Sequence, residues 1–269
     1  MSTTTRKNIL DDAIKPKAQP SHSPVLNSEK DRTTTHEQKP SEQLKTPFLV
    51  PNQTTQSSNP TVHLSYQQMC QSLVDDTPAN APSFQLGELQ NRFLLAHNKD
   101  RSRFGQQPLV WSNELAQHAQ RWADYLKTNY ACAMHHRSAL NQREGKEWGE
   151  NLAWNQTSKT ISIGYFASNP EKQVYGWNSE CIDYNLDSNT CQPGKQCRHF
   201  TQALWDSTTE VGCGVAVCNA GDAGFSKGGR AEIWVCNYNP QGNITITDQN
   251  KITTKLRPFK LNPPEQGKR

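Results

Sequence analysis

Apolar residues recur at helical spacing in the middle of the chain. Leu89, Phe93 and Ala96 lie three or four positions apart, which predicts a helix running to about Lys99. A second helix is predicted from Asn113, whose side chain can cap the first turn. The apolar face of this second helix consists of Leu115, Ala119, Trp122 and Leu126. Both helices are therefore expected to be half buried.

A third helix is predicted to begin at Asn169. Asn is a common N-cap, and the following Pro170 suits the first helical position because it needs no hydrogen-bond partner there. The apolar positions of this helix are Val174, Trp177 and Cys181. Its carboxylate Glu180 therefore lies beside a buried stripe.

After the third helix, the spacing of apolar residues changes to strand-like alternation. Residues 211–218 are small or β-branched and residues 231–238 read AEIWVCNY, so both segments are predicted to be strands. The Gly-rich segment 219–229 could join them as an antiparallel pair with Cys213 opposite Cys236. Helices followed by strands indicate an α+β domain or a layered αβα domain.

Both ends of the chain differ from this central part in composition. Residues 1–65 are rich in Thr, Ser, Pro and Lys and contain fourteen apolar side chains, of which only Phe48 is aromatic. Such a segment cannot bury enough surface to offset its conformational entropy. We predict a disordered linker or stalk at 1–65, a folded domain at 66–249 and a basic disordered tail at 250–269.

The positive charge of the chain lies outside the predicted domain. The whole chain has a net charge of +4, but residues 66–249 contain 15 Lys and Arg against 18 Asp and Glu. A folded nucleic-acid binder needs cations on its domain, so no nucleic acid is expected as a partner. No apolar run reaches the roughly 18 residues of a membrane span. The first residues lack the basic-then-apolar pattern of a secretory signal.

All eight cysteines fall within the predicted domain, and their number is even. They are Cys70, Cys132, Cys181, Cys191, Cys197, Cys213, Cys218 and Cys236. Disulfides are the first interpretation and place the protein outside the reducing cytoplasm. A structural zinc cluster is the alternative, although no C-x-x-C pair occurs.

Four polar residues stand near apolar or aromatic neighbours and could carry chemistry: His136, Glu150, Glu180 and His199. Imidazoles and carboxylates are suitable ligands for zinc or a similar divalent cation. Taken singly, each also has a purely structural explanation, and sequence separation does not tell whether they meet. The chain lacks the H-E-x-x-H, G-x-S-x-G and G-x-x-x-x-G-K signatures. The residues alone indicate a secreted, disulfide-stabilised domain of unknown activity.

Several motifs together resemble one known family. The segments RHFTQALW at 198–205 and IWVCNYNPQGN at 233–243 are similar to the two signatures of the CAP superfamily, which includes cysteine-rich secretory proteins, antigen 5 proteins and plant pathogenesis-related proteins. AHNKDR at 96–101, CAMHHRS at 132–138 and WGENLA at 148–153 agree with this resemblance. Arg198, where the family usually has Gly, and Ala203, where it usually has a larger aliphatic residue, depart from the pattern.

The resemblance implies a three-layer αβα sandwich, the SCP domain, with a large cleft. By motif position the cleft contains His136, His199, Glu150 and Glu180 as ligands of zinc or another divalent cation. The implied disulfides are Cys132–Cys218, Cys191–Cys197 and Cys213–Cys236. Because Cys70 and Cys181 remain over, we predict that they form a fourth bridge, between the segment before the first helix and the end of the third.

The resemblance also implies a function in binding. We expect a secreted monomer whose partner is a lipid, a sterol or a surface protein, with peripheral contact to membranes. Residues 161–166, which include Ile161, Ile163, Tyr165 and Phe166, are a candidate lipid surface and otherwise ordinary core. The competing hypothesis is a metal-dependent peptidase in which Glu150 or Glu180 acts as general base toward a zinc-bound water.

Overall fold

The structure is a computed structural model that describes residues 64–78, 84–138, 143–159, 161–162, 164–219 and 229–261. The predicted stalk at 1–65 therefore lies almost entirely outside the described residues, as do most of the Gly-rich segment 219–229 and Ile163. The helices are α1 (Tyr66–Asp75), α2 (Leu89–Arg103), α3 (Asn113–Tyr130), α4 (Pro170–Asn178) and α5 (Arg198–Ala203), with 3-10 helices η1 (Leu86–Glu88) and η2 (Ser179–Asp183).

A four-stranded sheet forms the centre of the described part, in the order β2-β7-β8-β3. Strand β2 is parallel to β7, and the other neighbours are antiparallel. The bounds of these strands are β2 (Val110–Trp111), β3 (Gly149–Thr157), β7 (Glu210–Asn219) and β8 (Arg230–Asn239). Two-residue strands pair outside this sheet, as β1 (Phe84–Gln85) with β4 (Tyr165–Phe166) and β5 (Tyr184–Asn185) with β6 (Thr190–Cys191).

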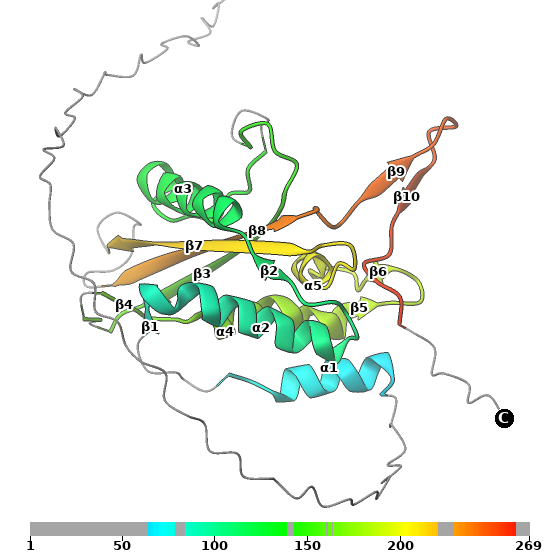
Figure 1. Cartoon of the computed structure of the whole chain (residues 1–269), viewed down its shortest axis with the longest axis horizontal. Helices are drawn as coiled ribbons and strands as arrows, with labels where there is room; N and C mark the ends of the chain where they lie inside the picture. Colours follow the sequence, from blue (N-terminus) through cyan, green and yellow to red (C-terminus); the bar gives the residue numbers. More distant parts are fainter. Residues whose placement is uncertain are drawn as a thin grey trace, which may run out of the picture. The chain divides into compact units, whose positions relative to one another are not determined.

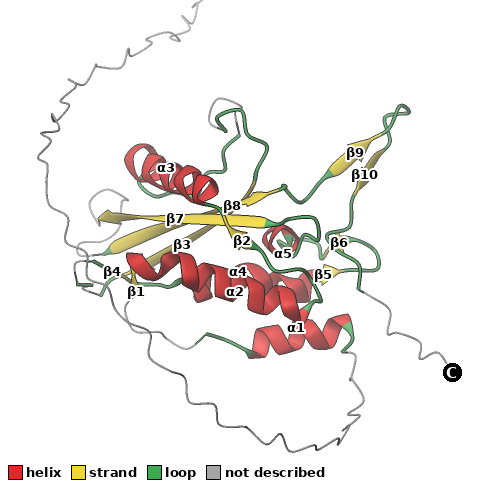
Figure 2. Ribbon diagram, in the orientation of Figure 1, coloured by secondary structure: helices red, strands yellow, loops and turns green. Residues whose placement is uncertain are grey.

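Helices cover both faces of the sheet, which gives the three-layer αβα sandwich that the resemblance implied. Figures 1 and 2 show α3 on one face of β7 and β8, and α2 with α4 on the other face. The backbone of α3 lies directly on β7 at Gly212. A side chain at this position would clash with the backbone of Ala116. On the opposite face, the ring of Phe93 packs on Trp177 and Trp234.

The sequence patterns locate the central elements well and their ends less well. The first predicted helix continues beyond Lys99 to Arg103, and the third ends as an α-helix at Asn178 before continuing as η2. Ser112, not Asn113, caps the second helix, because its hydroxyl oxygen accepts a hydrogen bond from the backbone N–H of Leu115. Helix α1 and strand β3 were not predicted.

The C-terminal segment is structured further than its composition suggested. Strand β9 (Thr245–Thr247) pairs with β10 (Thr253–Lys255) in an antiparallel hairpin. Phe259 is buried and packs against Phe104 and Phe200. The expectation of a disordered tail from residue 250 was therefore wrong as far as Leu261, because one aromatic anchor holds the segment on the domain.

Three of the four expected disulfides are formed. Cys132–Cys218 ties the end of α3 to β7, Cys213–Cys236 crosses from β7 to β8, and Cys191–Cys197 closes a short loop before α5. The expected fourth bridge is absent from the structure: Cys70 and Cys181 are free, and both are buried. Both side chains are buried where α1 packs against η2.

Candidate functional site

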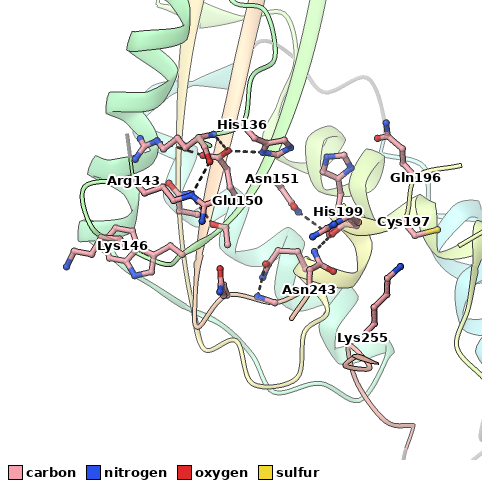
Figure 3. Close-up of a pocket in the computed structure, with 18 of the residues that line it drawn as sticks. His136, Arg143, Lys146, Glu150, Asn151, Gln196, Cys197, His199, Asn243 and Lys255 are labelled. Carbon is pink, nitrogen blue, oxygen red and sulfur yellow. Dashed lines mark hydrogen bonds and ion pairs between the residues drawn. The ribbon is translucent and has the colours of Figure 1, made fainter. Parts of the chain in front are cut away.

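A cleft of about 660 Å³ opens at one end of the central sheet (Figure 3). Its walls come from the segment after α3, the start of β3, the loop that leads into α5 and the segment after β8. His136, Glu150 and His199 line the cleft, whereas Glu180 does not. The structure thus brings three of the four predicted site residues to one cavity and places the fourth behind it.

His136 is held by Glu150. The Nδ1 atom of His136 lies 2.8 Å from Glu150 Oε1, which also accepts a hydrogen bond from the backbone N–H of Arg137 at 3.2 Å. A carboxylate only accepts, so in the neutral form of the imidazole Nδ1 carries the proton and Nε2 keeps its lone pair. No described residue hydrogen-bonds this Nε2 atom, and the His136 side chain is 58% exposed.

His199 is held in the same way by Glu180. Nδ1 of His199 lies 2.6 Å from Glu180 Oε1, and Glu180 Oε2 accepts hydrogen bonds from the backbone N–H groups of His199 and Phe200. The 3-10 helix η2 follows α4 directly and brings this carboxylate to the start of α5. Nε2 of His199 likewise has no hydrogen-bond partner in the described part of the chain.

The four residues therefore form two imidazole–carboxylate pairs. Within the described ranges, no group of three or more His, Cys, Asp or Glu side chains is arranged to hold a metal ion. Each carboxylate instead fixes the tautomer and orientation of its histidine, a task that outer-shell carboxylates commonly perform for metal-binding histidines. The sequence grouped all four as ligands, because chain spacing does not distinguish a ligand from the residue behind it.

Three of the further polar residues that line the cleft form one cluster that the sequence analysis missed: Arg137, His118 and Asn237. Arg137 is buried, and its guanidinium hydrogen-bonds the ring and the backbone carbonyl of His118. His118 Nδ1 also lies 3.0 Å from the Oδ1 atom of Asn237 on β8. Burial lowers the pKa of Arg137 to about 10 and lowers the pKa of His118. Arg137 directly follows His136, but nothing in the sequence marks it as buried.

A buried polar network supports the cleft from behind. Asn151 Nδ2 donates to the backbone carbonyl of His199 at 3.1 Å and to the hydroxyl of Tyr238 at 3.1 Å. The Tyr238 hydroxyl lies 2.9 Å from His97 Nε2, and His97 Nδ1 lies 2.8 Å from the carbonyl oxygen of Phe93. Burial lowers the pKa of His97 to about 4, so this imidazole is neutral near pH 7. The position of His199 is thereby tied to the core.

The segment 161–166 contributes to packing. Phe166 lies 5.2 Å from Phe84 and 5.6 Å from Trp234 between ring centroids, and both of these partners are fully buried. Phe166 is half buried and packs against the apolar core, as the alternative to a lipid surface expected. No helix in the described part of the chain has the length and apolarity needed to cross a membrane.

Comparison with known proteins identifies a family for this chain. The family model of the CAP domain, described as the cysteine-rich secretory protein family, matches residues 94–238. A pathogenesis-related protein PR-1 from Medicago truncatula is 34% identical over 61% of this chain and 80% of its own length. Pathogenesis-related protein 1C from Nicotiana tabacum is 36% identical over 58% of this chain and 77% of its own length.

Among solved structures, venom allergen-like protein 4 from Schistosoma mansoni is 25% identical, covers 66% of this chain and 97% of its own length, and has a TM-score of 0.42. The fold and the site define a disulfide-bonded αβα domain with paired histidines in a cleft. With the family match over residues 94–238, the chain belongs to the CAP family.

Proposed function

We propose that this chain is an extracytoplasmic binding protein and that the cleft between His136 and His199 is its binding site. The observation that carries the proposal is the pair of imidazoles, each oriented by a carboxylate with its Nε2 atom open to the same cleft. The volume of about 660 Å³ suits a small-molecule ligand. Three disulfides suit an oxidising compartment, and the family description refers to secretory proteins.

The finer part of the proposal is that this pair holds zinc or a similar divalent cation. Neutral imidazole nitrogens are preferred zinc donors, and the donor set fits because Glu150 and Glu180 already fix both rings through Nδ1. A bound cation would supply Lewis acidity toward a ligand in the cleft. Because the protein supplies only two ligands, water or a bound ligand must complete the coordination of the cation. The cationic side chains around the cleft favour weak binding of this cation.

Calorimetric titration with zinc near neutral pH tests the cation site. We expect binding by the wild type and its loss in His136→Ala and in His199→Ala. Glu180→Gln keeps a hydrogen-bonding group but removes the charge, so affinity should fall by about 10- to 100-fold. His135→Ala is the matched control, because His135 is exposed and is not among the residues lining the cleft. Absent zinc binding, or binding unchanged in both histidine variants, contradicts the assignment.

Lipid binding and peptide hydrolysis stay predictions without a supporting observation. The hollow beneath the β9–β10 hairpin has a volume of about 100 Å³, well below the roughly 300 Å³ at which small-molecule sites begin. Hollows of about 380 and 510 Å³ lie elsewhere on the described part of the chain. For hydrolysis, a general base must reach a water in the cleft. Glu180 instead accepts hydrogen bonds from His199 and Phe200 and does not line the cleft.

A further inference from the structure

The lining of the cleft is strongly cationic, in contrast to the predicted domain as a whole. Among the described residues, six Lys and Arg side chains line it, against a single carboxylate, Glu150. The six are Arg137, Arg143, Lys146, Lys195, Arg198 and Lys255. Residues 66–249 carry more acidic than basic side chains, so the cations are gathered locally. Like charges in a concave surface focus a positive potential and attract anions.

Three of these cations have no opposing charge among the described residues, and one of them, Arg143, donates to the carbonyl oxygen of Arg137. The side chains of Arg198 and Lys255 are exposed, and neither forms an ion pair with any described residue. Lys195 lies 3.6 Å from Asp183 and Lys146 lies 3.1 Å from Glu114, and the side chains of both lysines are about half exposed. Exposed ion pairs of this kind are weak, so a ligand can replace them.

The cations stand on two sides of the cleft. Figure 3 shows Arg143 and Lys146 on the side of Glu150, and Lys255 near Asn243 and Cys197. Lys195 and Arg198 lie inside and directly after the loop closed by the Cys191–Cys197 disulfide, which limits the movement of this backbone. A ligand that contacts both sides must carry more than one negative group.

Two features of this chain add to the charge. Arg198 occupies a position where the resemblance implies glycine, and Lys255 comes from the β9–β10 hairpin, outside the residues 94–238 that match the family. The hairpin is held in place because Asn189 Nδ2 donates to the carbonyl oxygen of Lys255 at 2.9 Å. Arg198 and Lys255 also line the smaller hollow, so they stand between the two cavities.

We propose that the cleft binds a small ligand carrying two or more phosphate or sulfate groups, with Lys195, Arg198 and Lys255 contacting one of these groups and Arg143 and Lys146 another. Guanidinium and ammonium groups donate charge-assisted hydrogen bonds to such oxyanions, and Arg can do so in a bidentate manner. This inference rests on the proposal that the cleft is the binding site, but it does not depend on a metal ion.

Calorimetry in the presence of EDTA tests the inference with three probes: pyrophosphate, sucrose octasulfate and uncharged sucrose. We expect the wild type to bind at least one charged probe, more weakly as salt is raised, and not to bind sucrose. The charged probe that binds more tightly identifies whether the cleft prefers phosphate or sulfate groups. Because EDTA removes divalent cations, this experiment is independent of the zinc titration. Oxyanion binding and zinc binding can therefore be confirmed or contradicted separately.

The decisive variant is Arg198→Ala with Lys255→Ala. Loss of two charge-assisted contacts should weaken binding of the charged probe by about tenfold or more. The matched control is Lys127→Ala with Lys260→Ala, which removes the same charge from exposed positions that do not line the cleft. Equal weakening in both double variants, binding that disappears with EDTA, or no binding of either charged probe overturns the proposal.

Discussion

Buried and exposed cations of this domain differ in whether the protein itself binds them. Arg101 is fully buried and donates to the carbonyl oxygens of Gln107, Ala203, Trp205 and Thr208. Arg198 and Lys255 are exposed at the cleft, and no carboxylate of the described chain pairs with them. Carbonyl oxygens of the fold bind the buried cation, whereas the exposed cations are open to a ligand. Substitutions should therefore separate stability from binding.

The largest effect is expected for Arg101→Met. Methionine fills part of the volume but leaves carbonyl groups in α5 and the following loop without donors, at about 1 to 3 kcal/mol for each buried group. We expect a loss of roughly 3 to 5 kcal/mol in the free energy of unfolding, measured by urea denaturation. Arg121→Met is the control, because the Arg121 side chain is 53% exposed and pairs with Glu144 at the surface. A loss below about 1 kcal/mol in Arg101→Met would show that water replaces the guanidinium.

A smaller effect is expected from the buried histidine as pH falls. Burial lowers the pKa of His97 to about 4, whereas an unfolded histidine titrates near its ordinary value of 6.5. Below about pH 6.5 the unfolded chain binds a proton that the folded protein does not, so stability decreases from there toward pH 4. Each pKa unit corresponds to about 1.4 kcal/mol, which gives a loss of about 2 kcal/mol between pH 7 and pH 5.

Urea denaturation of variants at both pH values isolates this contribution from that of other groups. His97→Gln should be less stable at pH 7, because the hydrogen bonds to Phe93 and Tyr238 are disturbed, and it should lose less stability on going to pH 5. His135→Gln, at an exposed position, should keep the wild-type difference between the two pH values. If His97→Gln loses as much stability between pH 7 and pH 5 as the wild type, the His97 imidazole is protonated in the folded protein. Buried and exposed histidines then do not differ in this respect.

Local patterns in the sequence predicted the layers of the fold. Helices α2, α3 and α4 and strands β7 and β8 bury apolar residues at regular spacing, which is visible in the chain. Strand β3 was missed because its first residues, GENL, are not an apolar alternation even though Asn151 and Leu152 are buried. Helix α1 depends on a Ser65–Gln68 capping box and on only a few buried side chains.

The candidate site was predictable only in part. Its histidines and carboxylates came from family motifs, but their arrangement as two pairs depends on contacts between distant segments. The same holds for cations: Arg101 lies among polar residues, and its burial depends on carbonyl groups about a hundred residues away. Lys195 and Lys255 meet at one cleft only because the hairpin folds back.

The smallest effect on stability is expected at the exposed cations. Arg198→Ala with Lys255→Ala removes two exposed side chains without an ion pair among the described residues, so the free energy of unfolding should change by no more than about 0.5 kcal/mol. Thermal unfolding should shift by less than about 2 °C. A destabilisation above about 1 kcal/mol would mean that these cations hold the hairpin or the α5 loop in place. Unchanged stability together with lost oxyanion binding would assign them to the ligand.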